Sequence, residues 1–210
     1  MVKKLMAANW KMYKTSAESR TVADELVRLT EDGLPGDREV LVCPPFPSLA
    51  SVAASFAGKA GFMVGAQNFY PAEEGAFTGE VSLNMLKEHG VSCVLTGHSE
   101  RRHVLGESHE MVGKKTSHAV SFGMRVILCI GETIEEREAG KLDEVLEKQL
   151  ESGLSGVSSA IDAASLAIAY EPVWAIGTGK VAGPKEIVDA HGRVRSLLEG
   201  MLPENGKDLG

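Results

Sequence analysis

The sequence predicts an α/β protein in which buried parallel strands alternate with amphipathic helices. Short apolar runs of β-type residues recur along the chain, and each is followed by a longer segment with helical spacing of its apolar residues. This alternation occurs six times, at intervals of roughly 35 residues. No linker rich in proline or serine divides the chain. We therefore expect a single domain over residues 1–210.

The predicted strands are short and apolar, as expected for a parallel sheet that is covered on both faces. A strand pattern of this kind is bounded by polar and turn-forming residues. The six strands are expected near Lys4–Ala8, Glu39–Cys43, Phe62–Gly65, Ser92–Leu95, Arg125–Ile130 and Leu166–Ala169.

The predicted helices fill the intervals between the strands and follow the last of them. Ser16 and Ser108 are expected to cap helix N-termini, because a serine hydroxyl accepts from the exposed backbone N–H groups there. Gly33, Gly90 and Gly123 are expected to end helices. The main helices are expected over Ala17–Leu29, Ser48–Ala57, Val81–Glu88, Ser108–Val120, Leu142–Leu154 and Ile187–Met201.

Composition and charge exclude two classes of partner. The chain is 43% hydrophobic and 24% charged, with a net charge of −7 and a pI near 5.4. Nucleic-acid binding requires clustered Lys and Arg, whereas here they are scattered among acids, as in residues 135–138 and 141–148. No apolar stretch approaches the roughly 18 residues of a membrane span. We expect no nucleic-acid partner, no membrane partner and solvated charged helix faces.

The cysteines indicate a reducing compartment. Cys43, Cys93 and Cys129 each lie in an apolar run, their number is odd, and no CxxC spacing occurs. A disulfide framework or a thiolate metal site is therefore not expected. The N-terminus has no signal-peptide pattern, because Lys3 and Lys4 lead directly into a short strand. We expect a cytoplasmic protein.

One segment predicts proton-transfer chemistry. The apolar strand Leu166–Ala169 is followed by Glu171, and then by the uncharged run Ala-Ile-Gly-Thr-Gly over residues 175–179. Two glycines in an uncharged run suit a loop that closes over a ligand. A carboxylate beside such a loop can act as a base in a site from which water is excluded.

The order of residues in this segment resembles that of the triosephosphate isomerase family. Two further segments carry the same resemblance: residues 7–12, Ala-Ala-Asn-Trp-Lys-Met, and residues 96–102, Thr-Gly-His-Ser-Glu-Arg-Arg. Weaker matches occur at residues 65–68, 75–80 and 128–132. The motifs stand in the family's order and span about residues 4–209. The resemblance implies a TIM-barrel-type fold of parallel βα units.

The resemblance also implies roles for four residues. Glu171 would take a proton from the carbon next to a carbonyl, and His98 would polarise the carbonyl oxygen and move the proton between oxygens. Lys11 would supply positive charge to a phosphate and to the enediolate oxygen, and Asn9 would supply an amide donor. Asparagine at a strand end also commonly shapes the turn. The substrate would be a small phosphosugar, and no cofactor is implied.

The closing loop is expected to follow the base directly. Gly177 is expected to offer its amide to the substrate phosphate. Residues 177–180, Gly-Thr-Gly-Lys, do not form a Walker motif, since Trp174 and Val181 occupy positions where that motif needs Gly and Ser or Thr. The expected lid comprises Pro172, Val173, Trp174, Ala175, Ile176, Gly177, Thr178, Gly179 and Lys180.

Two assignments remain open between a functional and a structural role. Glu100 lies two residues after His98, where proton relay and pairing with Lys11 are equally compatible with the pattern. The resemblance places Thr78 and Phe77 at a subunit interface, with Phe69 and Tyr70 adding apolar contact area. The alternative is a local aromatic cluster.

The histidines do not indicate a metal site. None of them forms a His-x-x-x-His or HExxH pair, so no metal is expected. Apart from His98, they are expected at the surface or in packing roles: His89, His103, His109, His118 and His191.

The number of βα units is the main departure from the family pattern. A barrel of this type closes with eight units, whereas six are predicted here, and residues 205–210 resemble a turn before a seventh strand. An unclosed sheet has two edges with unpaired backbone groups. We therefore expect an incomplete barrel that is completed by a homo-oligomer, by a complementing chain or by a rearranged sheet.

The resemblance implies a triosephosphate isomerase activity, which interconverts dihydroxyacetone phosphate and glyceraldehyde 3-phosphate, and a role in glycolysis and gluconeogenesis. The alternative is a weakly active or silent shortened barrel, which serves as an assembly module or as half of a split enzyme. The alternative arises because the family's phosphate-binding loops after the seventh and eighth strands are not found in the sequence.

Overall fold

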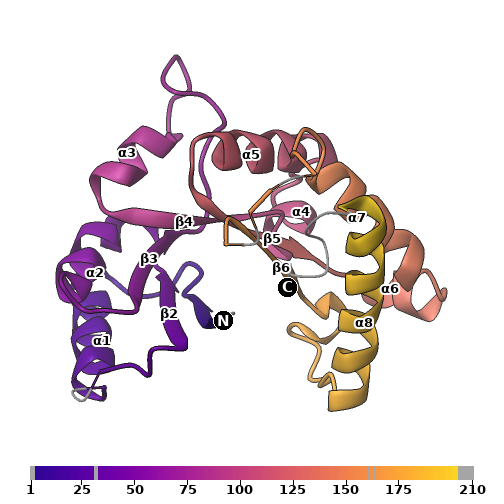
Figure 1. The fold of residues 1–210 in the computed structure, drawn as a ribbon, viewed down its shortest axis with the longest axis horizontal. Helices are drawn as coiled ribbons and strands as arrows, with labels where there is room; N and C mark the ends of the chain where they lie inside the picture. Colours follow the sequence, from indigo (N-terminus) through magenta and orange to yellow (C-terminus); the bar gives the residue numbers. More distant parts are fainter. Residues whose placement is uncertain (1–2, 31–32, 160, 163, 203–210) are drawn as a thin grey trace. The chain divides into compact units, whose positions relative to one another are not determined.

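The computed structural model describes residues 3–30, 33–159, 161–162 and 164–202, which form an α/β fold of parallel strands and helices (Figure 1). The chain divides into two compact units, Met1–Leu95 and Thr96–Gly210, and each unit is described by itself. A single domain over residues 1–210 therefore stays a prediction.

The first unit is built on parallel strands in sequence order. These are β1 (Lys4–Asn9), β2 (Arg38–Cys43), β3 (Phe62–Ala66) and β4 (Val91–Thr96), whose last residue opens the second unit. β1 pairs with β2, β2 with β3, and β3 with β4. In the register of β1 and β2, Asn9 lies opposite Cys43. The carboxyl end of β1, which carries Asn9, is thereby fixed against β2.

The helical elements of the first unit alternate with its strands along the chain. They are α1 (Ser16–Arg28), the 3-10 turn η1 (Phe46–Ser48), α2 (Leu49–Phe56) and α3 (Leu83–Glu88). In Figure 1, α1 and α2 lie side by side next to β2 and β3, and contacts join α1 to α2 and α2 to β3.

The second unit pairs β5 (Arg125–Ile130) with β6 (Leu166–Tyr170), again in parallel. The helices α5 (His109–Ser121), α7 (Leu142–Gly153) and α8 (Pro184–Met201) pack in series, with contacts between α5 and α7 and between α7 and α8 (Figure 1). The other elements of the unit are α4 (Ser99–His103), α6 (Ile134–Glu138) and the 3-10 turn η2 (Val173–Ala175).

The predicted fold class is confirmed. Each expected strand is present, with its ends within one residue of the prediction, and the six main helices are present. The short helices α4 and α6 were not expected, because five residues carry too little periodicity to be recognised. The expected turn at residues 205–210 lies outside the described residues. Within the described part of the chain, no helix is long and apolar enough to cross a membrane.

The prediction of Ser16 as an N-cap is wrong, whereas that of Ser108 is confirmed. Thr15 caps α1, because it forms a capping box with Glu18: each side chain bonds to the backbone N–H of the other residue. The Ser16 hydroxyl donates to the carbonyl of Pro47 instead, at 2.7 Å.

Candidate active site

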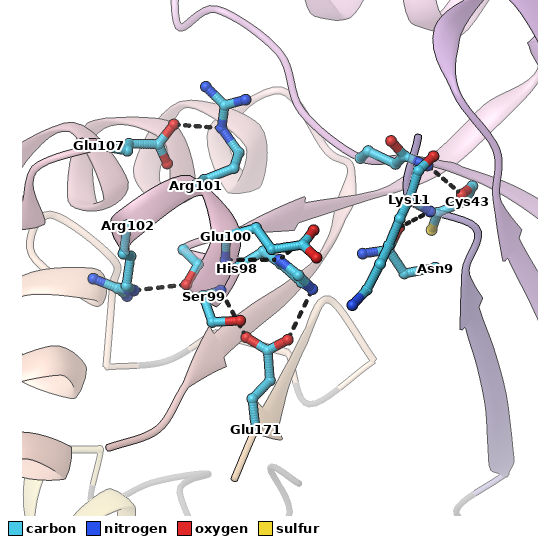
Figure 2. A network of polar contacts seen from close by, with 12 residues as sticks. Asn9, Lys11, Cys43, His98, Ser99, Glu100, Arg101, Arg102, Glu107 and Glu171 are labelled. Carbon is cyan, nitrogen blue, oxygen red and sulfur yellow. Dashed lines mark hydrogen bonds and ion pairs between the residues drawn. The ribbon is translucent and has the colours of Figure 1, made fainter. Parts of the chain in front are cut away.

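In the second unit, Glu171 and His98 contact each other directly (Figure 2). The His98 Nε2 atom lies 2.8 Å from Glu171 Oε1, and the backbone N–H of Ser99 donates to Glu171 Oε2, also at 2.8 Å. The two side chains are 10% and 16% exposed, so both are shielded but reachable. A base and an imidazole predicted from separate motifs therefore lie together.

The hydrogen bonds of His98 define its tautomer. His98 is the N-cap of α4, and its Nδ1 accepts from the backbone N–H of Glu100 at 3.2 Å. The ring proton therefore lies on Nε2, which donates to Glu171. The Glu100 carboxylate lies 3.7 Å from His98 Nδ1 and is half-exposed. A neutral imidazole with an Nε2–H is thus ready to donate to an oxygen.

Backbone contacts at the end of β6 position the base. The Glu171 N–H donates to the carbonyl of Ile130 at the end of β5, at 2.7 Å. Gly131 follows Ile130, and a Cβ atom at this position would collide with the Glu171 carbonyl. Glycine at residue 131 therefore permits the close approach that holds Glu171 beside β5.

In the first unit, a tight turn after β1 presents Lys11 (Figure 2). The Asn9 Oδ1 accepts from the Lys11 N–H at 2.9 Å, and Lys11 adopts a left-handed backbone conformation with φ +50°. The Gln67 amide donates to the carbonyls of both Lys11 and Cys43, at 2.9 Å each. Non-glycine residues adopt this conformation at a cost, so the three bonds hold a strained turn.

The lid segment, residues 172–180, is partly buried at its start and exposed at its end. Trp174 is buried, whereas residues 176–180 are exposed. The Arg137 guanidinium lies 4.3 Å above the centre of the Trp174 ring, and the Thr178 hydroxyl donates to the Trp174 carbonyl at 3.0 Å. Trp174 therefore anchors the segment, and its glycine-containing half faces solvent.

A fully buried carboxylate supports this anchor. Glu132 accepts from Arg137 at 2.8 Å and from the Tyr170 hydroxyl at 3.0 and 2.9 Å. Burial, together with the Glu132 charge, raises the pKa of Tyr170 to about 12, despite opposing contributions from Trp174 and Arg137. The phenol therefore stays protonated and remains a donor at neutral pH.

A second buried carboxylate lies beyond α4 and belongs to what we call the Glu107 cluster: Glu107, Arg101 and Lys115 (Figure 2 shows the first two). Glu107 Oε2 accepts from Arg101 Nε at 2.7 Å and from Lys115 Nζ. Burial opposes ionisation of Glu107, but the bonds and charges of Lys115 and Arg101 outweigh it and lower its pKa. The cluster is an internal ion network next to the helix that His98 caps.

Two aromatic residues near the predicted interface at Thr78 pack against each other. The Tyr70 and Phe77 rings lie 4.2 Å apart between centroids, while Phe77 remains 41% exposed. The expectation that Phe69 supplies interface area is wrong, because Phe69 is fully buried within its own unit. An interface at Thr78 and Phe77 stays a prediction.

The structure brings together the predicted residues of each unit: His98 with Glu171, and Asn9 with Lys11. Sequence reasoning assigned no role to Gln67 or Glu132, and it expected Arg137 on a solvated helix face, whereas Arg137 pairs with the buried Glu132 and lies over Trp174. Gln67 and Glu132 lie in the weaker matching motifs, which was the available signal. Among the described residues, no group of three or more His, Cys, Asp or Glu side chains is arranged to hold a metal ion, and the expected absence of a metal stays a prediction.

Comparisons with known proteins identify a single family. A family model described as triosephosphate isomerase matches residues 4–209. A triosephosphate isomerase of Nitratidesulfovibrio vulgaris (strain Miyazaki F) is 60% identical over 205 residues, which are 98% of this chain and 82% of that protein. The triosephosphate isomerase of Oleidesulfovibrio alaskensis is 59% identical, and the match covers 96% of this chain and 80% of that protein. The triosephosphate isomerase of Aquifex aeolicus is 46% identical, and the match covers 97% of this chain and 81% of that protein. The prediction that two C-terminal units are missing is not borne out by these comparisons.

Proposed function

Because the chain belongs to the triosephosphate isomerase family and shares its activity, an aldose–ketose isomerisation, we propose that Glu171 and His98 carry out the proton transfers of this reaction. The observation that supports the proposal is the 2.8 Å contact between Glu171 Oε1 and His98 Nε2. The alternative of a silent assembly module is not favoured, given the high identity over nearly the whole chain.

In the proposed mechanism, Glu171 removes a proton from C1 of dihydroxyacetone phosphate. The electron pair of the C–H bond forms the C1–C2 double bond, and the carbonyl oxygen accepts the proton that His98 donates from Nε2. His98 then recovers a proton from the hydroxyl on C1, and Glu171 returns its proton to C2, which yields glyceraldehyde 3-phosphate. Both Glu171 oxygens accept protein hydrogen bonds in the structure, so substrate binding has to replace the His98 contact.

Lys11 and Asn9 are proposed to bind the negatively charged oxygens of the substrate. An ammonium group suits both a phosphate dianion and the oxygen that becomes negative in the enediolate. The Asn9 oxygen accepts from the backbone of Lys11, which leaves its NH₂ group as the part of the side chain that donates to the substrate. The strained turn at Lys11 keeps this ammonium on a fixed backbone.

The proposed function is tested by assaying the purified chain with each triose phosphate in turn. We expect turnover in both directions, and we expect it to persist after treatment with a chelator, because the mechanism uses only side chains. Lack of turnover in a folded sample, as judged by circular dichroism, would refute the proposal. A third phosphosugar, a ketopentose phosphate, serves as a control and should not react.

Replacing Lys11 with methionine is expected to lower kcat/KM by about 10- to 150-fold, since a hydrogen bond to a charged group contributes roughly 1.5–3 kcal/mol. Lys59→Met is the matched control, because Lys59 is exposed in the same unit. Steady-state kinetics of both variants check the prediction, and equal kcat/KM values for the two would contradict it.

Replacing Gly177 with alanine is expected to impair closure of the lid segment. Gly177 has φ +73°, a conformation that costs an L-residue about 1–2 kcal/mol, so we expect kcat/KM about 5- to 30-fold lower. Gly192→Ala in α8 is the control, because that glycine has no positive φ and a Cβ there meets no atom within 4 Å. A Gly177→Ala variant with wild-type kinetics would show that this backbone conformation is not needed.

We also propose a homo-oligomer with Phe77 and Thr78 at the interface, and a cytoplasmic location. The exposure of Phe77 supports the first proposal. The burial of Cys43, Cys93 and Cys129 supports the second, and burial beside Cys93 raises the pKa of the Cys43 thiol, which keeps it protonated. Molar mass by light scattering, with Phe77→Asp compared with wild type, tests the interface: a variant that keeps the mass of the wild-type oligomer would refute it.

A further inference from the structure

Arg102 in α4, which Figure 2 labels, joins the backbone segments that carry the base and the imidazole. Its Nε donates to the Gly97 carbonyl at 2.6 Å, directly before His98, and a second nitrogen donates to the Cys129 carbonyl at 3.2 Å. Cys129 pairs in β5 with Ala169 of β6, two residues before Glu171. A Cβ on Gly97 would collide with this guanidinium, so the contact depends on glycine there.

The remaining guanidinium nitrogen of Arg102 meets His109, the first residue of α5. Its NH1 lies 3.2 Å from His109 Nδ1, and the Ser152 hydroxyl of α7 lies 3.4 Å from the same atom. Arginine has donors and no acceptor, so Nδ1 has to accept. The structure therefore requires a neutral His109 ring with its proton on Nε2.

A protonated His109 would place an N–H against the N–H groups of Arg102. The charged and titratable groups that act on the ring are Arg102 and His103 of α4, Lys148 of α7 and Glu136 of α6. Burial first, then Arg102 and Lys148, hold the pKa of His109 below its ordinary value of 6.5, and Glu136 opposes them. The cationic groups therefore favour the neutral ring that accepts from Arg102.

We propose that His109 is a positioning residue for the isomerase reaction: its neutral ring holds Arg102 against Gly97 and Cys129, and protonation releases Arg102 and loosens the turn that carries His98. The proposal rests on the roles given above to His98 and Glu171. The contact is intact at neutral pH and is lost as the pH falls below 6.5, through the lowered pKa of the ring. This acid sensitivity adds to any protonation of the base itself.

Two variants separate the ring's charge from its shape. His109→Asn keeps an oxygen that accepts from Arg102 at every pH, and we expect kcat within about twofold of wild type at neutral pH and a weaker loss of kcat near pH 5. His109→Lys imitates the protonated ring, and we expect kcat about tenfold lower throughout with a nearly unchanged KM, less than the ~100-fold effect of a 1 Å misplacement. His89→Asn, at an exposed position, is the control and should follow the wild-type pH profile.

Nitrogen NMR of the unmodified enzyme provides a readout that does not depend on activity. With ¹⁵N-labelled histidine, and the His109 signals assigned by their loss in His109→Asn, we expect a proton on Nε2 at neutral pH and a titration midpoint below 6.5. A proton on Nδ1, a midpoint at or above 6.5, or a His109→Asn pH profile that coincides with wild type would overturn the proposal. Failure of the proposed function itself would instead appear as unchanged turnover in Glu171→Gln, which the ring measurements do not affect.

Discussion

Replacing Glu171 with glutamine is expected to lower kcat by about 10²- to 10⁴-fold, the contribution of a general base. The amide keeps the shape of the side chain but cannot take a proton from carbon. It also accepts only one of the two hydrogen bonds that His98 and Ser99 give to the carboxylate. The loss in stability should stay near 1 kcal/mol, as expected for one hydrogen bond.

Steady-state kinetics and thermal unfolding on the same sample check this expectation. Glu88→Gln is the matched control, since Glu88 is exposed at the end of α3. A Glu171→Gln variant that keeps the kcat of wild type would remove Glu171 from the role of base. A variant that unfolds would be replaced by Glu171→Asp, which retains the carboxylate but shortens its reach.

Replacing Glu107 with glutamine is expected to lower the free energy of unfolding by about 3–5 kcal/mol, the cost of removing one partner from a buried ion pair. The Glu107 and Lys115 side chains are each 4% exposed, so water cannot take over the lost interactions. Arg101 loses its carboxylate partner as well. Urea unfolding, followed by circular dichroism, measures the change.

Glu110→Gln in α5, the helix that carries Lys115, is the control for the Glu107 cluster. Glu110 pairs with Lys114 at 2.6 Å, but the side chains are 75% and 61% exposed, so solvent screens the pair and its loss should leave the free energy of unfolding nearly unchanged. Equal losses for the two variants would contradict a special role for burial.

Because the pKa of Glu107 lies below 4.5, its stabilisation is complete above that pH and is lost as the pH falls through the lowered pKa. The unfolding free energy of Glu107→Gln should therefore decline less steeply in acid.

The strands were predictable because each is an apolar run that is short enough to be told from a helix. The contact between Glu171 and His98 followed from one rule, that the carboxyl ends of parallel strands share a face. The motif around Asn9 likewise indicated a turn after β1. In these places local sequence and tertiary structure agree.

The contacts around the site were not predictable, because they depend on which distant segments meet. The residues next to Glu107 and Glu132 in the sequence do not distinguish them from exposed glutamates. Both side chains are nevertheless buried, and each pairs with cationic side chains. The contact of His109 with Arg102 depends on the packing of α5 against α7, which Gly113 permits because a Cβ there would collide with the Ser152 carbonyl. Periodicity gives the face of a helix, but not its partner.

The isomerisation carried out in D₂O reports whether the proton that Glu171 removes exchanges with solvent. A carboxylate that holds the abstracted proton exchanges it with solvent to some extent before returning it to carbon. Proton NMR of glyceraldehyde 3-phosphate formed in D₂O should therefore show deuterium at C2, and Glu171→Gln should incorporate none over the same period. If the wild-type enzyme converted dihydroxyacetone phosphate completely and left C2 fully protonated, the hydrogen would have moved without a base that exchanges with water, which contradicts proton transfer by Glu171.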